Sequence, residues 1–320
     1  MISTSRSLYF YQYLEKIWLI IDFLQLYTML WNISQSWGMP FLWVYWTRSL
    51  VWSSLDYFST TEYGALMGRS NFLNLSEWGQ MSNYISYCAC FALIPLFFGI
   101  VYYSSIKYLN VYGKRLDLYM PYIEVFILFI GQLLYLPIGL VVFRLYHCEN
   151  NLLAVDPVWS CTDYRYITYT IIFTAFLFPL YFVLPAVLYK LSFSSLVYNL
   201  PQDHEKRLVA WEILHLLDID NHYLKHHTWL IASFNLSGSM HRFHMMLLKA
   251  SMLVLYAFFR NNYILQALLF FLAYTIFCIF SVLNFPYRRQ SSNYLLLMFS
   301  GALFVDVLFG KSAITNNFLK

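Results

Sequence analysis

The sequence predicts an all-α integral membrane protein: a polytopic bundle of about seven transmembrane helices with an additional amphipathic helix at the interface. Hydrophobic residues make up 60% of the 320-residue chain and charged residues only 11%, against roughly 25% charged in an ordinary soluble domain. Several uncharged runs reach the ~20 apolar residues that cross a hydrocarbon core. The net charge of +4 is too small to indicate a nucleic-acid-binding surface.

The amino-terminal third is predicted to hold two crossings and a segment at the membrane surface. Residues 14–31 are the first apolar segment, and a Gly-Met-Pro sequence after it breaks the helix. Residues 41–55 carry Arg48 at their centre with tryptophans around it. Because an arginine at mid-bilayer costs at least ~2.5–3.5 kcal/mol, we expect this piece to lie in the interface. Residues 56–83 form a polar surface loop, and residues 84–105 form the second crossing.

The rest of the chain is predicted to add five crossings to one domain that takes in residues 1–320. The apolar segments are residues 119–143, 166–189, 244–259, 262–287 and 293–309. A cysteine-containing loop covers residues 144–165, and a long polar loop covers residues 192–243. Within the long loop, residues 204–218 place apolar side chains at helical spacing opposite charged ones. We expect this amphipathic helix to lie on the cytoplasmic membrane face, with partner binding as the alternative.

Lysine and arginine predict the orientation of the bundle. With the amino terminus in the cytoplasm, twelve of the 20 basic residues fall on the cytoplasmic side and seven on the opposite side, while Lys249 stays in the membrane. Cytoplasmic loops of membrane proteins are enriched in these residues. The bias therefore puts the 192–243 loop in the cytoplasm and the 144–165 loop on the other side.

Cys148 and Cys161 lie at the two ends of the 144–165 loop. On the non-cytoplasmic side a disulfide between them persists, and closing a loop of this size contributes ~3 kcal/mol in the chain-entropy model. The alternative is two free thiols in a reducing compartment. We expect the disulfide.

Charged residues inside or near the apolar segments are the candidate functional residues, because such side chains usually face a bundle interior or a water path. They are Asp22, Glu124, Lys249 and Asp306. Glu124 and Lys249 lie at similar distances from helix starts on the same side, so the two are predicted to pair at equal depth. The alternative is that both side chains snorkel to the headgroups.

Histidines form two short clusters. His222, His226 and His227 make one, and His241 and His244 make the other. Membrane di-iron desaturases and hydroxylases use several such boxes to surround their irons with imidazole nitrogens. The remaining histidines do not complete such a set, so we expect solvated side chains and no bound iron or zinc. Lipids are the bound molecules that the sequence favours.

Four short motifs occur in the order found in a known membrane module. They are Leu24-Gln25-Leu26 leading to Trp37-Gly-Met-Pro40, Tyr146-His-Cys148 to Leu153-Ala-Val-Asp156-Pro with Cys161, Phe178-Pro179-Leu180 to Leu184-Pro185, and Phe285-Pro286-Tyr287 followed by Asn293. In this order they resemble the carboxy-terminal membrane module of large protist cell-surface proteins with EGF-like and GCC-type cysteine-rich repeats. That module is distantly similar to TRP/polycystin-like membrane domains. The resemblance covers most of residues 14–309.

The resemblance implies a channel, transport or sensory role. One alternative is a structural subunit of an organellar membrane complex, for example in a mitochondrion, which the high tyrosine and phenylalanine content suits. A second alternative is a histidine-box membrane oxidase. We expect a non-enzymatic membrane protein of the plasma membrane or of an organellar membrane such as the mitochondrial inner membrane. Its expected partners are lipids and other membrane subunits, not nucleic acid.

Overall fold

The described residues are mostly helical, as the all-α prediction expects, with one small sheet that was not predicted. The computed structural model describes residues 2–34, 88–89, 92–94, 96–104, 120–153, 156–197, 203, 205–210, 234–259 and 262–318. Its long helices are α1 (Ile2–Ser34), α5 (Met120–Arg144), α6 (Tyr164–Val197), α9 (His241–Phe258), α10 (Tyr263–Asn284) and α11 (Gln290–Phe318). A small antiparallel sheet joins α5 to α6 and consists of β1 (Cys148–Glu149), β2 (Leu152–Leu153) and β3 (Asp156–Ser160).

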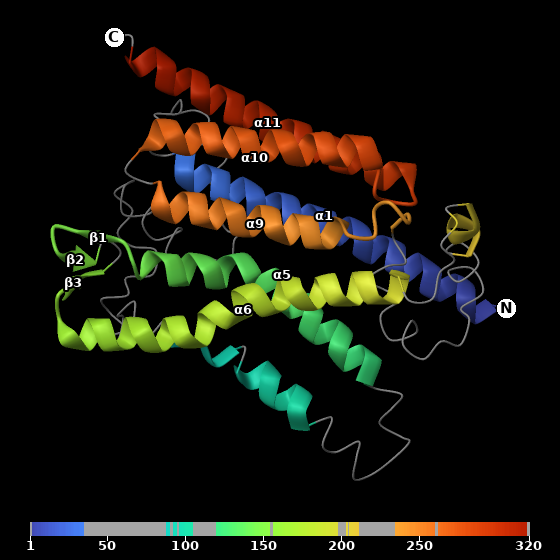
Figure 1. Ribbon diagram of the computed structural model, residues 1–320, viewed down its shortest axis with the longest axis horizontal. Coiled ribbons are helices and arrows are strands. Elements are labelled where there is room, and N and C mark those ends of the chain that lie inside the picture. The colour runs from blue at the N-terminus through green and yellow to red at the C-terminus, as the bar shows by residue number, and fades with distance from the viewer. Residues whose placement is uncertain are drawn as a thin grey trace, which may run out of the picture.

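The long helices lie side by side in three layers (Figure 1). α10 and α11 form one outer layer, α1 and α9 the middle layer, and α5 and α6 the other outer layer. α1 contacts α11, α9 contacts α10, and both α5 and α6 contact α9. Because helices cover the middle layer on both sides, polar groups on α1 and α9 lie inside the bundle.

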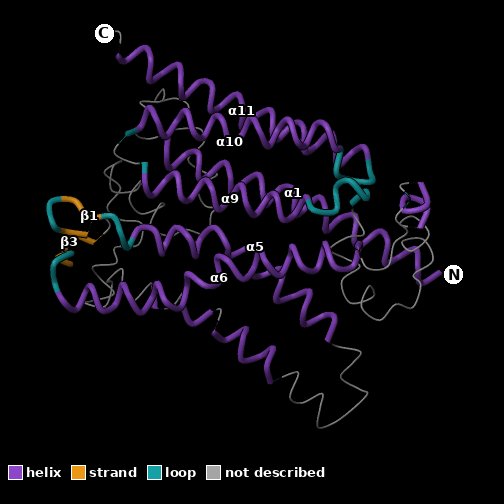
Figure 2. Tube along the Cα trace, in the orientation of Figure 1, coloured by secondary structure: helices purple, strands orange, loops and turns teal. Residues whose placement is uncertain are grey.

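The two ends of the bundle hold different parts of the chain (Figure 2). At one end lie the start of α1, the end of α6 and the start of α9; at the other end lie the sheet and the start of α6. This second end is called the sheet end below. The arrangement agrees with an orientation that puts the amino terminus and the cysteine loop on opposite sides. Which side is cytoplasmic stays a prediction.

Three helices of the described residues are long and apolar enough to cross a membrane. They are Phe126–Arg144, Ile264–Asn284 and Gln290–Leu308. This finding supports a membrane protein, whereas the predicted total of about seven crossings is not supported. α1 carries Glu15, Lys16 and Asp22 along its length, and the short α9 carries Lys249. Apolarity alone therefore does not identify these two helices as crossings.

Several helix ends differ from the sequence-based boundaries. α1 begins at Ile2, well before residue 14, and α6 continues through Val197 into the predicted 192–243 loop. The last residues of that loop belong to α9. A helix satisfies its own backbone whether or not its side chains are apolar, so apolar segments underestimate helix length. Residues 205–210 are helical, as the predicted amphipathic helix requires. The predicted interfacial segment 41–55 and surface loop 56–83 lie outside the described residues.

A glycine and a proline fix the contact between α5 and α6. Pro185 has no N–H to offer the Tyr181 carbonyl one turn earlier. The Tyr135 hydroxyl donates to that carbonyl at 3.2 Å, and the Tyr181 hydroxyl donates to the Tyr135 carbonyl at 2.7 Å. Gly139 makes room for this exchange, because a Cβ there would clash with the Tyr181 hydroxyl. The two helices are thereby joined near their middle.

The link between α10 and α11 is held by two asparagines. Asn293 accepts a hydrogen bond from the Tyr287 N–H at 2.9 Å and donates to the Tyr287 carbonyl at 2.8 Å. Asn235 donates to the carbonyls of Phe285 and Tyr287 at 3.1 and 3.2 Å. Phe285 has a φ of 37°, so it reverses the chain after α10. The Phe285-Pro286-Tyr287 and Asn293 motif therefore forms one hydrogen-bonded turn.

The cysteine loop is a hairpin with a further strand. Asn150 and Asn151 have φ values of 52° and 66°, the left-handed conformations that a type I′ turn requires and asparagine tolerates. Cys148 and Cys161 face each other at disulfide distance, with their Cα atoms 6.4 Å apart. This spacing fits the ~4.4–6.8 Å of bridged cysteines. The Tyr166 hydroxyl donates to the Leu145 carbonyl and anchors α6 beneath the hairpin.

Candidate functional site

Two polar side chains of α1 face α9 in the middle layer. Asp22 and Gln25 are three positions apart, so they share one face of α1. The Nζ atom of Lys249 lies 2.5 Å from Asp22 Oδ1 and 2.7 Å from Gln25 Oε1. The side chain of Lys249 is 1% exposed and that of Asp22 is 19% exposed. The ion pair therefore lies inside the bundle, with Asp22 nearer its edge.

Gln25 connects this ion pair to α5. Its Nε2 atom donates to the Leu133 carbonyl at 2.6 Å. Pro137, four positions further along α5, has no N–H with which to satisfy that carbonyl. Gln25 thus accepts from Lys249 and donates to the carbonyl that Pro137 leaves open. Because buried polar groups cost free energy unless they are hydrogen-bonded, one amide stabilises two otherwise unfavourable features.

A second set of opposite charges lies seven positions before the first. Glu15 precedes Asp22 on α1, and Arg242 precedes Lys249 on α9. Seven residues make about two helical turns, so each helix keeps its two charges on one face. α1 and α9 run parallel (Figure 1), which brings the acidic face of one to the basic face of the other. Glu15 is buried in the bundle, at the level of α9 that also holds Arg242.

Aromatic rings and an amide surround Arg242. Its guanidinium carbon lies 5.6 Å from the ring centroids of Trp18 and Phe234, within the range of cation–π attraction. Its Nη1 atom donates to Gln132 Oε1 at 3.4 Å. Tyr287 lies in the link between α10 and α11, and burial raises the pKa of its hydroxyl well above the ordinary value, an effect that Arg242 opposes. The phenol is therefore neutral at physiological pH and adds no charge to the network.

His241 and His244 pack against aromatic rings. The His241 centroid lies 5.4 Å from that of Tyr287 and 5.8 Å from that of Phe277, and the His244 centroid lies 4.5 Å from that of Phe280. His241 is buried, so its predicted solvation is wrong. Over the described ranges, no group of three or more His, Cys, Asp or Glu side chains is placed to hold a metal ion. The histidines outside the described residues include His222, His226 and His227.

Two of the four predicted charged candidates meet in the structure. Lys249 does form a buried pair, but the carboxylate that it contacts belongs to Asp22 of α1. The predicted pairing with Glu124 is corrected accordingly; the side chain of Glu124 lies outside the described residues. Asp306 is partly buried on α11, which packs against α10 and α1.

Sequence reasoning missed four members of this network: Glu15, Gln25, Gln132 and Arg242. The shared seven-residue spacing of the acids on α1 and the bases on α9 was visible in the sequence. It becomes informative only once these two helices are known to be parallel neighbours. The Leu133 carbonyl without a partner in its own helix was also foreseeable, because Pro137 lies four positions later inside an apolar segment. We name the connected residues Glu15, Asp22, Gln25, Gln132, Arg242 and Lys249 the charge network.

Comparison of the chain with protein-family models, with curated proteins and with solved structures finds no match. The geometry of the charge network is thus the basis for any functional conclusion.

Proposed function

We propose that the chain is a multi-pass membrane protein that passes small ions across its membrane, with the Lys249–Asp22 pair as its gate. The position of this pair carries the proposal. Ionisable residues within membrane bundles are costly and commonly mark ion pathways, relays or switches. Here the buried cation and its carboxylate join the two middle helices of a bundle that contains three candidate crossings.

The proposed gate works through the separation of α1 from α9. In the closed state Lys249 donates to Asp22 and Gln25, and these contacts hold α9 against α1. Movement of α9 away from α1 breaks both contacts and exposes two charges that attract water. Asp22 is the more accessible member, so water or a proton reaches it first. The exposed and hydrated side chains of Lys249 and Asp22 then line an ion pathway between the two helices.

The proposal includes three finer features. α1, α6 and α9 are membrane helices as well, because each packs against helices that contain a candidate crossing. Cys148 and Cys161 form a disulfide on the non-cytoplasmic side. The channel, transport or sensory role agrees with the resemblance to TRP/polycystin-like modules. The membrane is the plasma membrane or that of an organelle.

Ion flux through reconstituted protein tests the proposal. The purified full chain is placed in liposomes, and potassium and proton flux are followed with fluorescent indicators. Lys249→Met removes the gate cation, and we expect its basal flux to exceed that of the unaltered chain by about tenfold, the effect of ~1.4 kcal/mol on an opening equilibrium. Lys206→Met is the matched control, because Lys206 is 76% exposed and pairs with Asp203 at the surface.

The structural-subunit alternative predicts a different result. If neither the unaltered chain nor the Lys249→Met variant carries flux, while both keep their helical content and elute as single species, the gate is refuted. Equal increases in the Lys249→Met and Lys206→Met variants also refute it, because they indicate a general effect of lost positive charge.

A further inference from the structure

A groove along α9 opens between α5 and α6. Its volume is about 550 Å³. α9 contributes side chains at intervals of three and four positions, the spacing of one helix face: Phe243, Leu247, Ala250, Val254 and Phe258. From the first to the last of these, the helix rises ~22 Å. No charged side chain of the described residues lines this groove. The groove is therefore a long, mainly apolar depression on the side of the bundle.

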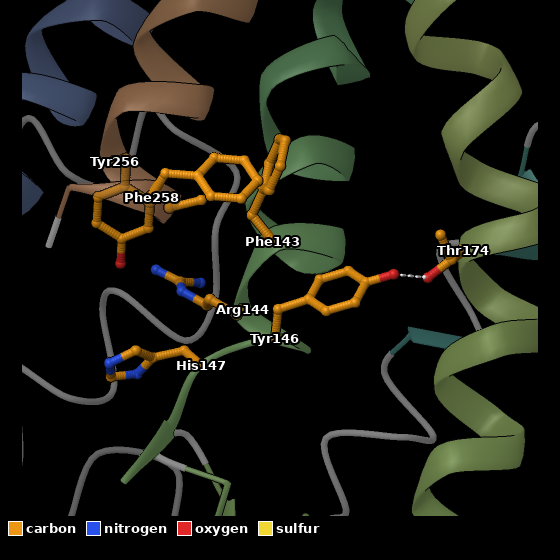
Figure 3. A pocket seen from close by; sticks show the side chains of 8 residues that line it. Phe143, Arg144, Tyr146, His147, Thr174, Tyr256 and Phe258 are labelled. Atoms are coloured by element: carbon orange, nitrogen blue, oxygen red, sulfur yellow. Dashed lines mark hydrogen bonds between the residues drawn. The ribbon is translucent and has the colours of Figure 1, made fainter.

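A second cavity, of about 460 Å³, adjoins the groove at the sheet end. Phe143 and Phe258 line both cavities. An arginine and a histidine line the second cavity beside its aromatic rings, whereas no charged side chain of the described residues lines the first. Arg144, His147 and the Tyr256 hydroxyl end on the same side of it (Figure 3). Together the two cavities form one continuous space. Its apolar arm is the groove along α9, and its cationic end is the cavity that holds Arg144 and His147.

The position of Arg144 is fixed by the fold. It is the last residue of α5, where the helix dipole favours a cation, and it is only 3% exposed. Next to it, the Tyr146 hydroxyl and Thr174 Oγ1 lie 2.7 Å apart and join the end of α5 to α6 across the cavity (Figure 3). The guanidinium is therefore held at the junction of the sheet end with the apolar groove.

We propose that the two cavities form one binding site for an anionic phospholipid, with the phosphate at Arg144 and His147 and one acyl chain along α9. Arginine binds phosphate through paired charge-assisted hydrogen bonds. The ~22 Å groove accommodates an extended chain, since one leaflet contributes about half of a ~30 Å hydrocarbon core. A free anion would use only the cationic end and leave the apolar arm unfilled. This site does not depend on the proposed ion gate.

Lipid binding to the full chain tests the inference. The protein in detergent micelles is titrated with phosphatidylglycerol or phosphatidylcholine, and bound lipid is counted by native mass spectrometry. We expect one phosphatidylglycerol to bind at least about tenfold more tightly than phosphatidylcholine, and Arg144→Gln to remove that preference. Arg165→Gln is the matched control, because Arg165 is exposed at the same end of the bundle, and it leaves the preference within about twofold.

A second pair of variants tests the apolar arm without altering a buried charge. Val254→Trp fills the groove, and Val305→Trp places the same side chain on an exposed position of α11. Val254 is 42% and Val305 45% exposed. We expect the first to weaken phosphatidylglycerol binding by about tenfold and the second to leave it unchanged.

Three outcomes overturn the inference. The first is equal binding of the two lipids by the unaltered chain. The second is equal loss in the Val254→Trp and Val305→Trp variants. The third is displacement of phosphatidylglycerol by inorganic phosphate, which would assign the cationic end to a free anion.

Discussion

Among the described residues, two lysine–aspartate pairs lie in opposite environments. Lys249 and Asp22 lie 2.5 Å apart, with side chains 1% and 19% exposed. Lys206 and Asp203 lie 3.7 Å apart, with side chains 76% and 56% exposed. The chemistry of the two pairs is the same. The first connects two helices far apart in the sequence, and the second connects residues three positions apart.

The difference between these pairs comes from solvent. At the surface, water already stabilises each charge, so the attraction adds only ~0–1 kcal/mol. Inside the bundle Lys249 loses its water and Asp22 loses most of its own, so the loss of one partner leaves the other charge largely uncompensated. Burying the pair is itself costly, so its retention does not make the fold maximally stable. It makes the contact between α1 and α9 sensitive to charge, as a gate requires.

The largest expected effect is that of Lys249→Met. Methionine keeps most of the volume but leaves Asp22 inside the bundle without its cation. We expect the free energy of unfolding to fall by about 3–5 kcal/mol, the usual cost of breaking a buried pair. Titration of the protein in mixed micelles with sodium dodecyl sulfate, followed by circular dichroism, measures the change. A loss below ~1 kcal/mol would mean that the pair behaves like a surface pair.

A double-mutant cycle sharpens this result by identifying the partner. Adding Asp22→Asn to Lys249→Met removes the orphaned carboxylate, so we expect recovery of about 1–3 kcal/mol. Glu124→Gln, which removes the carboxylate expected from the sequence, serves as the comparison and gives additive losses. Recovery with Glu124→Gln instead of Asp22→Asn would restore the sequence-based pairing and contradict the structure.

The next effect concerns the amide between the pair and α5. Gln25→Leu removes one acceptor of Lys249 and the donor to the Leu133 carbonyl. We expect a loss of about 1–3 kcal/mol in the same titration, the cost of unsatisfied buried polar groups. Adding Pro137→Ala gives α5 an N–H for the Leu133 carbonyl and recovers part of the loss. If Pro137→Ala makes the Gln25→Leu variant less stable, the hydrogen bond from Gln25 to the Leu133 carbonyl is not what stabilises the protein.

The sequence predicted the helices better than their contacts. Apolar segments located the cores of α5, α10 and α11, because the hydrocarbon core imposes a length on each of them. The polar ends of α1 and α6 escaped prediction, because helix formation there does not depend on apolar side chains. The hairpin of the cysteine loop was foreseeable, since Asn150-Asn151 is typical of a type I′ turn.

The partner of Lys249 was beyond the reach of sequence reasoning. Depth along each helix was estimated from the helix start, which matched Lys249 with Glu124. The choice between Glu124 and Asp22 depends on which helix faces α9 and how that helix is rotated. Both are decided by packing, including that of Phe23 of α1 on Phe299 of α11, whose rings stack at 4.3 Å. One sequence contains no direct signal for such a rotation.

The smallest expected effect completes the comparison. Lys206→Met removes the surface partner of Asp203, and water replaces it at once. The two residues are three positions apart at the helical residues 205–210, where such pairs contribute only ~0.2–0.5 kcal/mol and are screened by salt. We expect the unfolding free energy to change by less than about 0.5 kcal/mol at 0.15 M salt. The same titration with and without added salt checks this, since the small contribution of Lys206 should vanish with salt while that of Lys249 persists. A salt-independent loss in the Lys206→Met variant comparable to that of Lys249→Met would show that positive charge in general, and not burial, accounts for the role of Lys249.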